Sequence, residues 1–243
     1  MKQLLTQSDV AQLGTILGIW AHPDDETWSS AGLMAMAADN GQRVVCVTAT
    51  YGENGVQDPA RWPEDHLAEI RKNELEAACS VIGVKKHFYL GYRDGQCKNI
   101  AAKDALTQLV RIIDQEQPDT ILTFGPSGTT GHPDHITVSA WASQAVAASQ
   151  YNPAIYHSVQ SRQWYERSGK RLDEQFNIFF NIDSPPLVEE AKADIALKLT
   201  GEYCDRKKRA LEAQPSQTAH MLQVASPTDI TDLACFECFM RAA

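Results

Sequence analysis

Two short apolar segments, each followed by a run of histidine and carboxylate residues, constrain the fold of this chain most strongly. The segments span residues 15–20 and 120–124, and the polar runs span residues 21–26 and 131–135. Short apolar runs of this kind are typical of buried strands. Because parallel strands end at a common edge of a sheet, we expect both polar runs to lie together at the edge where open α/β sheets bind ligands.

Strand-like and helix-like segments alternate from residue 15 to about residue 160, which predicts a parallel sheet wrapped by helices. The expected strands are 15–20, 43–49, 87–90, 120–124, 154–159 and 176–182, and the expected helices are 27–40, 65–82, 101–116, 134–150 and 187–213. We therefore expect an α/β fold, a Rossmann-like three-layer sandwich with a mostly parallel sheet and a metal site at its carboxyl edge. Residues 1–243 form one domain in this interpretation, since no linker or repeat interrupts the pattern.

The composition argues against several partners. The 243 residues include 22 Lys and Arg against 31 Asp and Glu, a formal net charge of −9. That balance disfavours nucleic acid and anionic membranes, which bind clustered basic residues. No segment reaches the roughly 20 apolar residues of a membrane helix. The first strand is not followed by G-x-G-x-x-G, which disfavours a dinucleotide-binding domain. A small-molecule substrate is the expected partner, and a homo-oligomer is possible.

The N-terminal residues lack the apolar stretch of a signal peptide, so we expect a cytoplasmic protein. The six cysteines fit that compartment because they show no disulfide-framework spacing. Cys235 and Cys238 form a C-x-x-C pair within an expected apolar C-terminal helix. Without a second cysteine pair, a packing role is favoured over metal or redox chemistry.

The polar runs contain the donors of a hydrolytic zinc site. Zinc binds imidazole nitrogen and carboxylate oxygen, and a catalytic site uses three protein ligands and one open position. His22 and Asp25 lie three residues apart in a strand-to-helix turn, and His135 follows the second strand. We expect these three residues to be the metal ligands, with ferrous iron as an alternative to zinc.

The remaining members of the runs suit acid–base chemistry. Asp24 is expected to act as the general base, and protonated His132 is expected to stabilise the oxyanion or protonate the leaving amine. Asp134 is close enough in sequence to orient an imidazole.

These runs resemble motifs of the PIG-L or LmbE-like zinc de-N-acetylases, which include N-acetylglucosaminyl-phosphatidylinositol deacetylase and the deacetylases of mycothiol and bacillithiol synthesis. Five stations occur in the family's order between about residues 15 and 140: His-Pro-Asp-Asp-Glu at 22–26, Gly-Glu-Asn-Gly at 52–55, Arg-Lys-Asn-Glu-Leu at 71–75, Leu-Gly-Tyr-Arg-Asp-Gly at 90–95, and the segment 118–135 ending in Gly-His-Pro-Asp-His.

The resemblance implies the same roles as the side-chain chemistry above: three metal ligands, a general base at Asp24 and an acid or electrophilic partner at His132. It also implies that Arg71 and Asp94 hold the substrate, with the aspartate accepting hydrogen bonds from sugar hydroxyls, and that Asn54 lies near the pocket mouth. The chain departs from the family at Thr130, where relatives often carry tyrosine. It departs again at Gln214, where many members carry the histidine of a His-x-Ser-Gln run.

The expected function is removal of an N-acetyl group from an N-acetylglucosamine-type substrate, by zinc-activated water with Asp24 as general base. An amidase acting on a thiol conjugate or another N-acyl metabolite is the alternative. A non-catalytic carbohydrate-binding protein is a third reading, and the intact set of expected ligands and base argues against it. Among the five tryptophans, Trp62 in the Gly- and Pro-rich loop 51–64 is the one expected to contact ligand.

Overall fold

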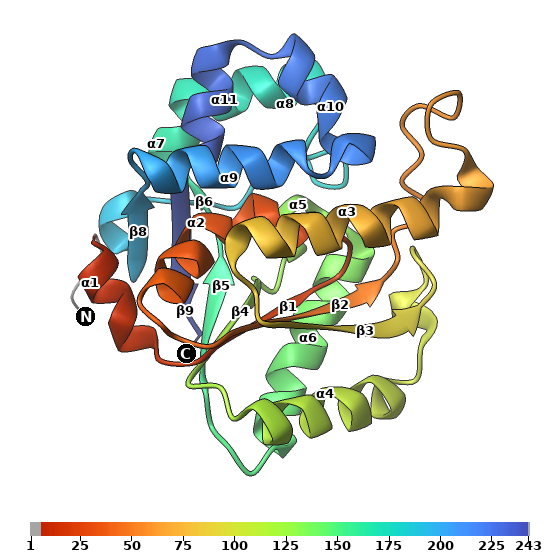
Figure 1. Cartoon of the computed structure of the whole chain (residues 1–243), viewed down its shortest axis with the longest axis vertical. Helices are drawn as coiled ribbons and strands as arrows, with labels where there is room; N and C mark the ends of the chain where they lie inside the picture. Colours follow the sequence, from red (N-terminus) through yellow and green to blue (C-terminus); the bar gives the residue numbers. More distant parts are fainter. Residues whose placement is uncertain (1–5, 243) are drawn as a thin grey trace.

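The computed structural model describes residues 6–242 and contains a seven-stranded sheet in the order β3-β2-β1-β4-β5-β9-β8 (Figure 1). Its strands are β1 (Ile16–Trp20), β2 (Val44–Thr50), β3 (Lys86–Tyr92), β4 (Thr120–Phe124), β5 (Ala154–Ser158), β8 (Ile195–Lys198) and β9 (Phe236–Arg241). The first five are mutually parallel, and β9 runs antiparallel to both β5 and β8. The expected α/β fold with a mostly parallel sheet is confirmed.

The central strands are buried along their whole length. Every residue of β1, β2 and β4 is buried, which explains why these strands are mainly apolar, with threonine as the only polar residue type, instead of alternating. In the register, Gly18 of β1 lies between Cys46 of β2 and Leu122 of β4. The two polar runs therefore leave the sheet from adjacent strands.

Helices cover both faces of the sheet (Figure 1). Helices α2 (Asp25–Asp39) and α3 (Leu67–Ile82) lie on one face, whereas α4 (Ala102–Glu116) and α6 (Pro133–Ala148) lie on the other. Helix α3 ends at Gly83, whose φ of 95° is a left-handed conformation that glycine adopts without strain. The chain runs outward from β1 through β2 to β3 and then returns to place β4 on the other side of β1. Neighbouring β1 and β4 therefore form a topological switch point, the position at which such sheets bind ligands.

The shorter elements gather mainly in the C-terminal half. They are α1 (Gln7–Val10), η1 (Ala11–Leu13), η2 (Glu64–His66), η3 (Cys97–Asn99), α5 (Gly128–Gly131), β6 (Gln160–Ser161), α7 (Arg162–Trp164), η4 (Tyr165–Gly169), α8 (Lys170–Phe176), β7 (Leu187–Val188), η5 (Glu190–Lys192), α9 (Glu202–Glu212), α10 (Pro215–Val224) and α11 (Pro227–Ala234). Helices α7, α8, α10 and α11 stack beyond α9 at the top of Figure 1. Over residues 6–242, no helix combines the length and the apolar character needed to cross a membrane.

The C-terminal half differs from the sequence prediction in three places. Residues 176–182 do not form a strand: α8 ends at Phe176, Asn177 takes a left-handed φ of 53°, and the segment turns. Its apolar residues pack into a small cluster instead of a sheet. Residues 187–213 are not one helix, because residues 195–198 form β8 against β9, and the helix begins only after Gly201, at φ 52°.

The third difference concerns the cysteine pair. Cys235 follows α11 and Cys238 lies within strand β9, so the expected helix ends before both. Cys204 and Cys235 form a disulfide with a Cα–Cα distance of 4.8 Å, which corrects the expectation of a packing role for Cys235. The pairing was not visible in the sequence because the partners come from α9 and from the segment before β9, 31 residues apart.

Candidate metal centre

The first polar run forms the turn between β1 and α2. Asp25 is the first residue of α2, and its Oδ2 accepts hydrogen bonds from the backbone amides of Ala21 (3.2 Å) and His22 (2.7 Å). The carboxylate therefore fixes the turn that carries it, and a negative charge at a helix N-terminus is favourable. His135 comes from the first turn of α6, the helix that follows the second run.

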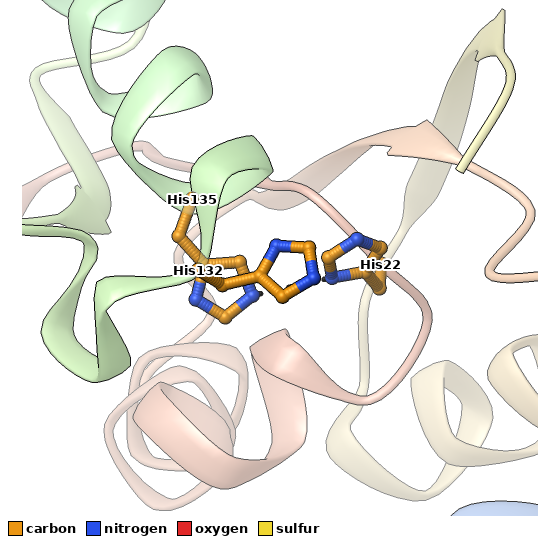
Figure 2. Close-up of side chains that lie close together, drawn as sticks. All are labelled: His22, His132 and His135. Atoms are coloured by element: carbon orange, nitrogen blue, oxygen red, sulfur yellow. Dashed lines mark hydrogen bonds between the residues drawn. The ribbon is translucent and has the colours of Figure 1, made fainter. Parts of the chain in front are cut away.

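His22, Asp25 and His135 converge on one point (Figure 2 shows the imidazoles). His22 Nδ1 lies 3.2 Å from His135 Nε2 and 3.5 Å from Asp25 Oδ2, and His135 Nε2 lies 3.3 Å from Asp25 Oδ1. All three side chains are buried. Two imidazole nitrogens and a carboxylate in mutual contact form a donor set suited to a divalent ion.

The outer partners of the two imidazoles decide which nitrogens face inward. His135 Nδ1 lies 3.0 Å from the carbonyl oxygen of Gly128, so that nitrogen carries the proton and Nε2 is a free acceptor. His22 Nε2 lies 3.0 Å from Asp94 Oδ1 and 3.4 Å from Asp134 Oδ2, and although burial acts to lower the pKa of His22, the carboxylates of Asp134, Asp25 and Asp94 hold it well above its usual value. His22 Nδ1 and His135 Nε2 therefore face each other beside the Asp25 carboxylate, and a cation could take the place of the hydrogen that they share. The residues therefore fit a bound metal.

His132 joins the same group from a different position. It is the N-cap of α6, and its Nδ1 accepts the backbone amide of Asp134 at 3.2 Å. Its ring centroid lies 4.7 Å from that of His22 and 4.9 Å from that of His135, and the three imidazoles form one group of possible metal donors (Figure 2). With Nδ1 used as an acceptor, the neutral ring carries its proton on Nε2.

The surroundings of His132 favour the neutral ring over the protonated one expected from the sequence. Burial lowers the pKa of His132 to about 4, and the neighbouring imidazoles of His22 and His135 act in the same direction against the opposing carboxylates of Asp134 and Asp25. The ring is therefore neutral near pH 7 and donates from Nε2 as an imidazole, whereas the sequence interpretation assigned it an extra proton.

Asp24 has an unusual backbone and an unusual pKa. Its φ of 109° is a conformation that non-glycine residues rarely adopt, and its amide donates to Glu26 Oε2 at 3.1 Å. Burial raises the pKa of Asp24 to about 7, Arg71 opposes the rise, and the charges of Asp25 and Glu26 add to it. Arg71 Nη2 lies 3.4 Å from Asp24 Oδ2. A buried carboxylate with a pKa near neutrality is typical of a general base.

The other carboxylates of the centre are held ionised. Burial alone would raise the pKa of Asp25, but His135 and His22 outweigh it and place the pKa well below the usual range. Burial also acts to raise the pKa of Asp94, and His22 with the Asn54 amide lowers it to about 2. Burial likewise acts to raise the pKa of Asp134, but His22 and the backbone amides of Gly95 and Cys97 lower it.

The residues expected to hold substrate form contacts within the protein. Arg71 donates to the carbonyl oxygens of Gly52 (Nη1, 2.7 Å) and Pro23 (Nη2), and its Nε has no hydrogen-bond partner among the described residues. Asn54 donates its backbone amide to Asp94 Oδ2 (3.0 Å) and its side chain to the Asp94 carbonyl (2.7 Å). Both residues, together with Asp94, line the cavity described next.

A cavity of about 560 Å³ opens over this centre. Residues of both polar runs line it together with side chains from the C-terminal half, including Trp164, Phe180 and Met221. Trp62, expected to meet ligand, does not line it, whereas Trp28 and Trp164 do. No local signal in the sequence distinguished these tryptophans, because their approach to the centre depends on the packing of α2 and α7.

A buried network behind Asp24 was also missed. Gln214 Nε2 donates to Glu26 Oε1 at 2.9 Å and contacts Thr27 Oγ1 at 2.8 Å. Glu26 is fully buried, and burial raises its pKa to about 6. The departure of Gln214 from the family pattern was the one signal in the sequence that pointed to this network. Its partners Glu26 and Thr27 lie 188 and 187 residues away, so the sequence did not identify them.

Two comparisons identify the class of protein. A family model for PIG-L, described as GlcNAc-PI de-N-acetylase, matches residues 17–146, the segment that contains both polar runs. The chain is also 33% identical over 227 residues to the 1D-myo-inositol 2-acetamido-2-deoxy-alpha-D-glucopyranoside deacetylase of Actinosynnema mirum, covering 83% of this chain and 80% of that protein. The chain belongs to the PIG-L family. It is a hydrolytic deacetylase of the metal-dependent kind, with a His/Asp site that fits a metal ion.

Solved structures agree on the architecture. The N,N'-diacetylchitobiose deacetylase of Pyrococcus horikoshii is 25% identical, with a TM-score of 0.67, and the match covers 94% of this chain and 83% of that one. The 4-carboxy-2-hydroxymuconate hydratase of Pseudomonas putida has the same fold at 19% identity, with a TM-score of 0.61, covering 91% of this chain and 82% of its own. A different reaction on the same fold means that the activity has to be argued from the site.

Proposed function

We propose that this chain removes the N-acetyl group from an N-acetylglucosamine-type substrate, with a zinc ion held by His22, Asp25 and His135. The observation that carries the proposal is the inward meeting of one imidazole nitrogen from His22, one from His135 and the Asp25 carboxylate, at 3.2 to 3.5 Å from one another. The deacetylase from Actinosynnema mirum and the one from Pyrococcus horikoshii act on acetylated amino sugars according to their names, which supports this substrate class.

Zinc suits a mixed nitrogen and oxygen donor set, and ferrous iron is the second candidate. When bound, the ion supplies Lewis-acid polarisation of the amide carbonyl and lowers the pKa of a water molecule. Asp94 and Asp134 act on this centre through His22, because their carboxylates hold its outward Nε2.

The remaining steps belong to side chains of the chain itself. Asp24 takes a proton from the attacking water, and Arg71 holds the carboxylate in place from 3.4 Å. His132, neutral and protonated on Nε2, donates a hydrogen bond to the oxygen that becomes negative in the tetrahedral state. Asp24 then delivers this proton to the departing nitrogen as the C–N bond breaks, which releases acetate and the free amine.

Substrate binding is proposed for Arg71, Asp94 and Asn54, which line the cavity. The unpartnered Nε of Arg71 is a donor available to a hydroxyl or carbonyl oxygen. Because residues from His22 to Cys238 line the same cavity, we infer that the chain works as one domain. A cytoplasmic location stays a prediction from the sequence.

Metal analysis combined with acetate release from N-acetylglucosamine derivatives tests the proposal. We expect about one divalent ion per chain, and loss of most of it in His22→Ala and His135→Ala. His132→Ala is the matched test of the neighbouring imidazole, and it should keep the ion while kcat falls. His66→Ala, an exposed histidine on η2, controls for loss of any histidine. Full metal loading of a His22→Ala/His135→Ala double variant would contradict the ligand assignment.

Asp24→Asn separates binding from chemistry. We expect this variant to retain the ion and to lose a factor of about 10²–10⁴ in kcat, the usual contribution of a general base. Near-native turnover would show that proton removal does not need Asp24. If the wild type releases acetate from no amino sugar, the substrate proposal fails, and a panel of other N-acyl compounds then tests the wider amidase alternative.

A further inference from the structure

The cavity continues from the metal centre into a second part that the reaction itself does not require. Six apolar side chains line this part, and we call them the apolar arm: Trp164, Ile178, Phe179, Phe180, Met221 and Leu233. They come from α7, from the turn that follows α8, from α10 and from α11. The metal centre, in contrast, comes from the segments after β1 and β4. The arm and the centre are continuous within one cavity.

The apolar arm is separate from the main core. Trp164, Ile178, Met221 and Leu233 belong to a small cluster of their own, apart from the large cluster around the sheet. Phe180 is 65% exposed although it is a large aromatic residue. Apolar surface that faces a cavity and stays in contact with water gains free energy when a ligand covers it.

Trp164 also carries a polar group without a partner. The residue is only 4% exposed, yet its Nε1 is a buried donor with no hydrogen-bond partner among residues 6–242. The six-membered edge of its indole lies against Gly169, which leaves the Nε1 edge on the opposite side of the ring. Buried donors without partners are uncommon, and a ligand oxygen is one way to satisfy such a donor.

From these contacts we propose that the amide substrate carries an apolar substituent, aryl or alkyl, that occupies the apolar arm while its amide lies at the metal centre. This inference rests on the proposed deacetylase function and names the substrate class of the same site. The substituent enters either as the aglycone of the sugar or as a longer acyl chain on its nitrogen. Both sources present the same apolar chemistry to the arm.

A four-compound panel tests the proposal through kcat/KM. Methyl N-acetylglucosaminide is the reference, phenyl and hexyl N-acetylglucosaminides carry the apolar aglycone, and methyl N-hexanoylglucosaminide carries the apolar acyl group. We expect at least one apolar compound to exceed the reference by about tenfold or more, within the ~10–200-fold range of hydrophobic pockets. The compound that does so identifies the source. Equal or lower values for all three overturn the inference.

Variants locate the preference in the arm. Phe180→Ala should cut the ratio of apolar to reference kcat/KM by about threefold or more, and Phe180→Tyr should restore most of it. Val224→Ala is the matched control, because Val224 is also a large exposed apolar residue (49%) but does not line the cavity. A ratio that stays unchanged in Phe180→Ala, or falls equally in Val224→Ala, contradicts the assignment.

A binding measurement separates this inference from the proposed function. Calorimetry of the Asp24→Asn variant with the phenyl and methyl glycosides reports the apolar preference without turnover. If the wild type hydrolyses no compound but the variant binds the phenyl glycoside about tenfold more tightly than the methyl glycoside, the proposed function fails and the inference about the apolar arm stands. If acetate is released from the methyl glycoside and no apolar compound binds more tightly, the proposed function stands and the arm fails.

Discussion

Asp24 occupies a backbone conformation that is costly for aspartate, and a buried network holds it there. The Asp24 amide donates to the Glu26 carboxylate, which in turn accepts a hydrogen bond from Gln214, the N-cap residue of α10. The meeting of the two polar runs was predictable, because each run lies close to its strand in sequence. The support of Asp24 was not, since Glu26 and Gln214 are 188 residues apart and no local pattern links them.

Removing this support should affect the chemistry more than substrate binding. Gln214→Ala deprives the Glu26 carboxylate of one buried donor, and a lost hydrogen bond of this kind costs about 1–3 kcal/mol. We expect kcat to fall about tenfold with KM nearly unchanged, because Gln214 acts through the position of Asp24. Gln214→His, which restores a donor, should recover part of kcat.

Steady-state kinetics of these two variants and of Gln175→Ala, an exposed position on α8, would check the expectation. An equal fall in kcat for Gln175→Ala, or a change confined to KM, would show that the network does not position Asp24.

At the scale of elements, the predicted strands and helices up to residue 160 agree with the structure to within a few residues. In this part the central strands are largely apolar, and helix α3 stops at a clear signal, Gly83. Beyond residue 160 the elements are short and pair with distant partners. The strand β8 is buried only because β9 pairs with it, so its short apolar run was indistinguishable from the first turn of a helix.

The β2–β3 pair contains a histidine whose burial links stability to pH. His87 Nε2 lies 2.9 Å from Thr48 Oγ1, and burial lowers the pKa of His87 to about 4. The unfolded chain binds a proton at this residue below about pH 6.5, whereas the folded chain does so only below about 4. The free energy of unfolding should therefore fall as the pH drops from 6.5 to 4.

Urea denaturation across that range should show a weaker pH dependence in His87→Gln than in the wild type. His66→Gln is the control, since His66 is exposed on η2 and its side chain is 66% accessible. Parallel stability curves for the wild type and His87→Gln would indicate that His87 is protonated in the folded protein.

A buried ion pair fastens α2 to the C-terminal elements. Lys207 Nζ lies 2.9 Å from Glu237 Oε1, and both side chains have no exposure. The Glu237 carboxylate also accepts the amides of Gly32 and Leu33 in α2 at 2.8 Å. We expect Glu237→Gln to lower the free energy of unfolding by about 3–5 kcal/mol, because it leaves the Lys207 ammonium without a counter-charge.

Lys207→Met combined with Glu237→Gln should recover part of that loss in the same urea experiment. Glu189→Gln breaks the exposed pair with Arg162 (2.7 Å) and should cost only about 0–1 kcal/mol. A similar small loss for Glu237→Gln would mean that the buried pair is energetically neutral.

At the scale of the whole molecule, the disulfide between Cys204 and Cys235 closes a loop across the C-terminal half. Of the six cysteines, Cys46, Cys79, Cys97 and Cys238 are free and buried. Thiol titration of the unfolded, unreduced protein should therefore detect four groups, and titration after reduction should detect six. For a loop of 31 residues, reduction should cost about 3–4 kcal/mol of stability. Six reactive thiols before reduction would contradict the disulfide.

The position of β9 has a consequence for synthesis on the ribosome. This strand lies between β5 and β8, yet it is made after every other strand of the sheet. Until it emerges, the nascent chain exposes the edge of β5, and β8 lacks its partner. Unpaired strand edges are templates for aggregation. The cavity is also incomplete at that stage, because Phe236, Glu237 and Cys238 of β9 line it. The segments after β1 and β4 that bear the metal residues are translated early, so the metal centre is synthesised well before the last strand completes the binding site.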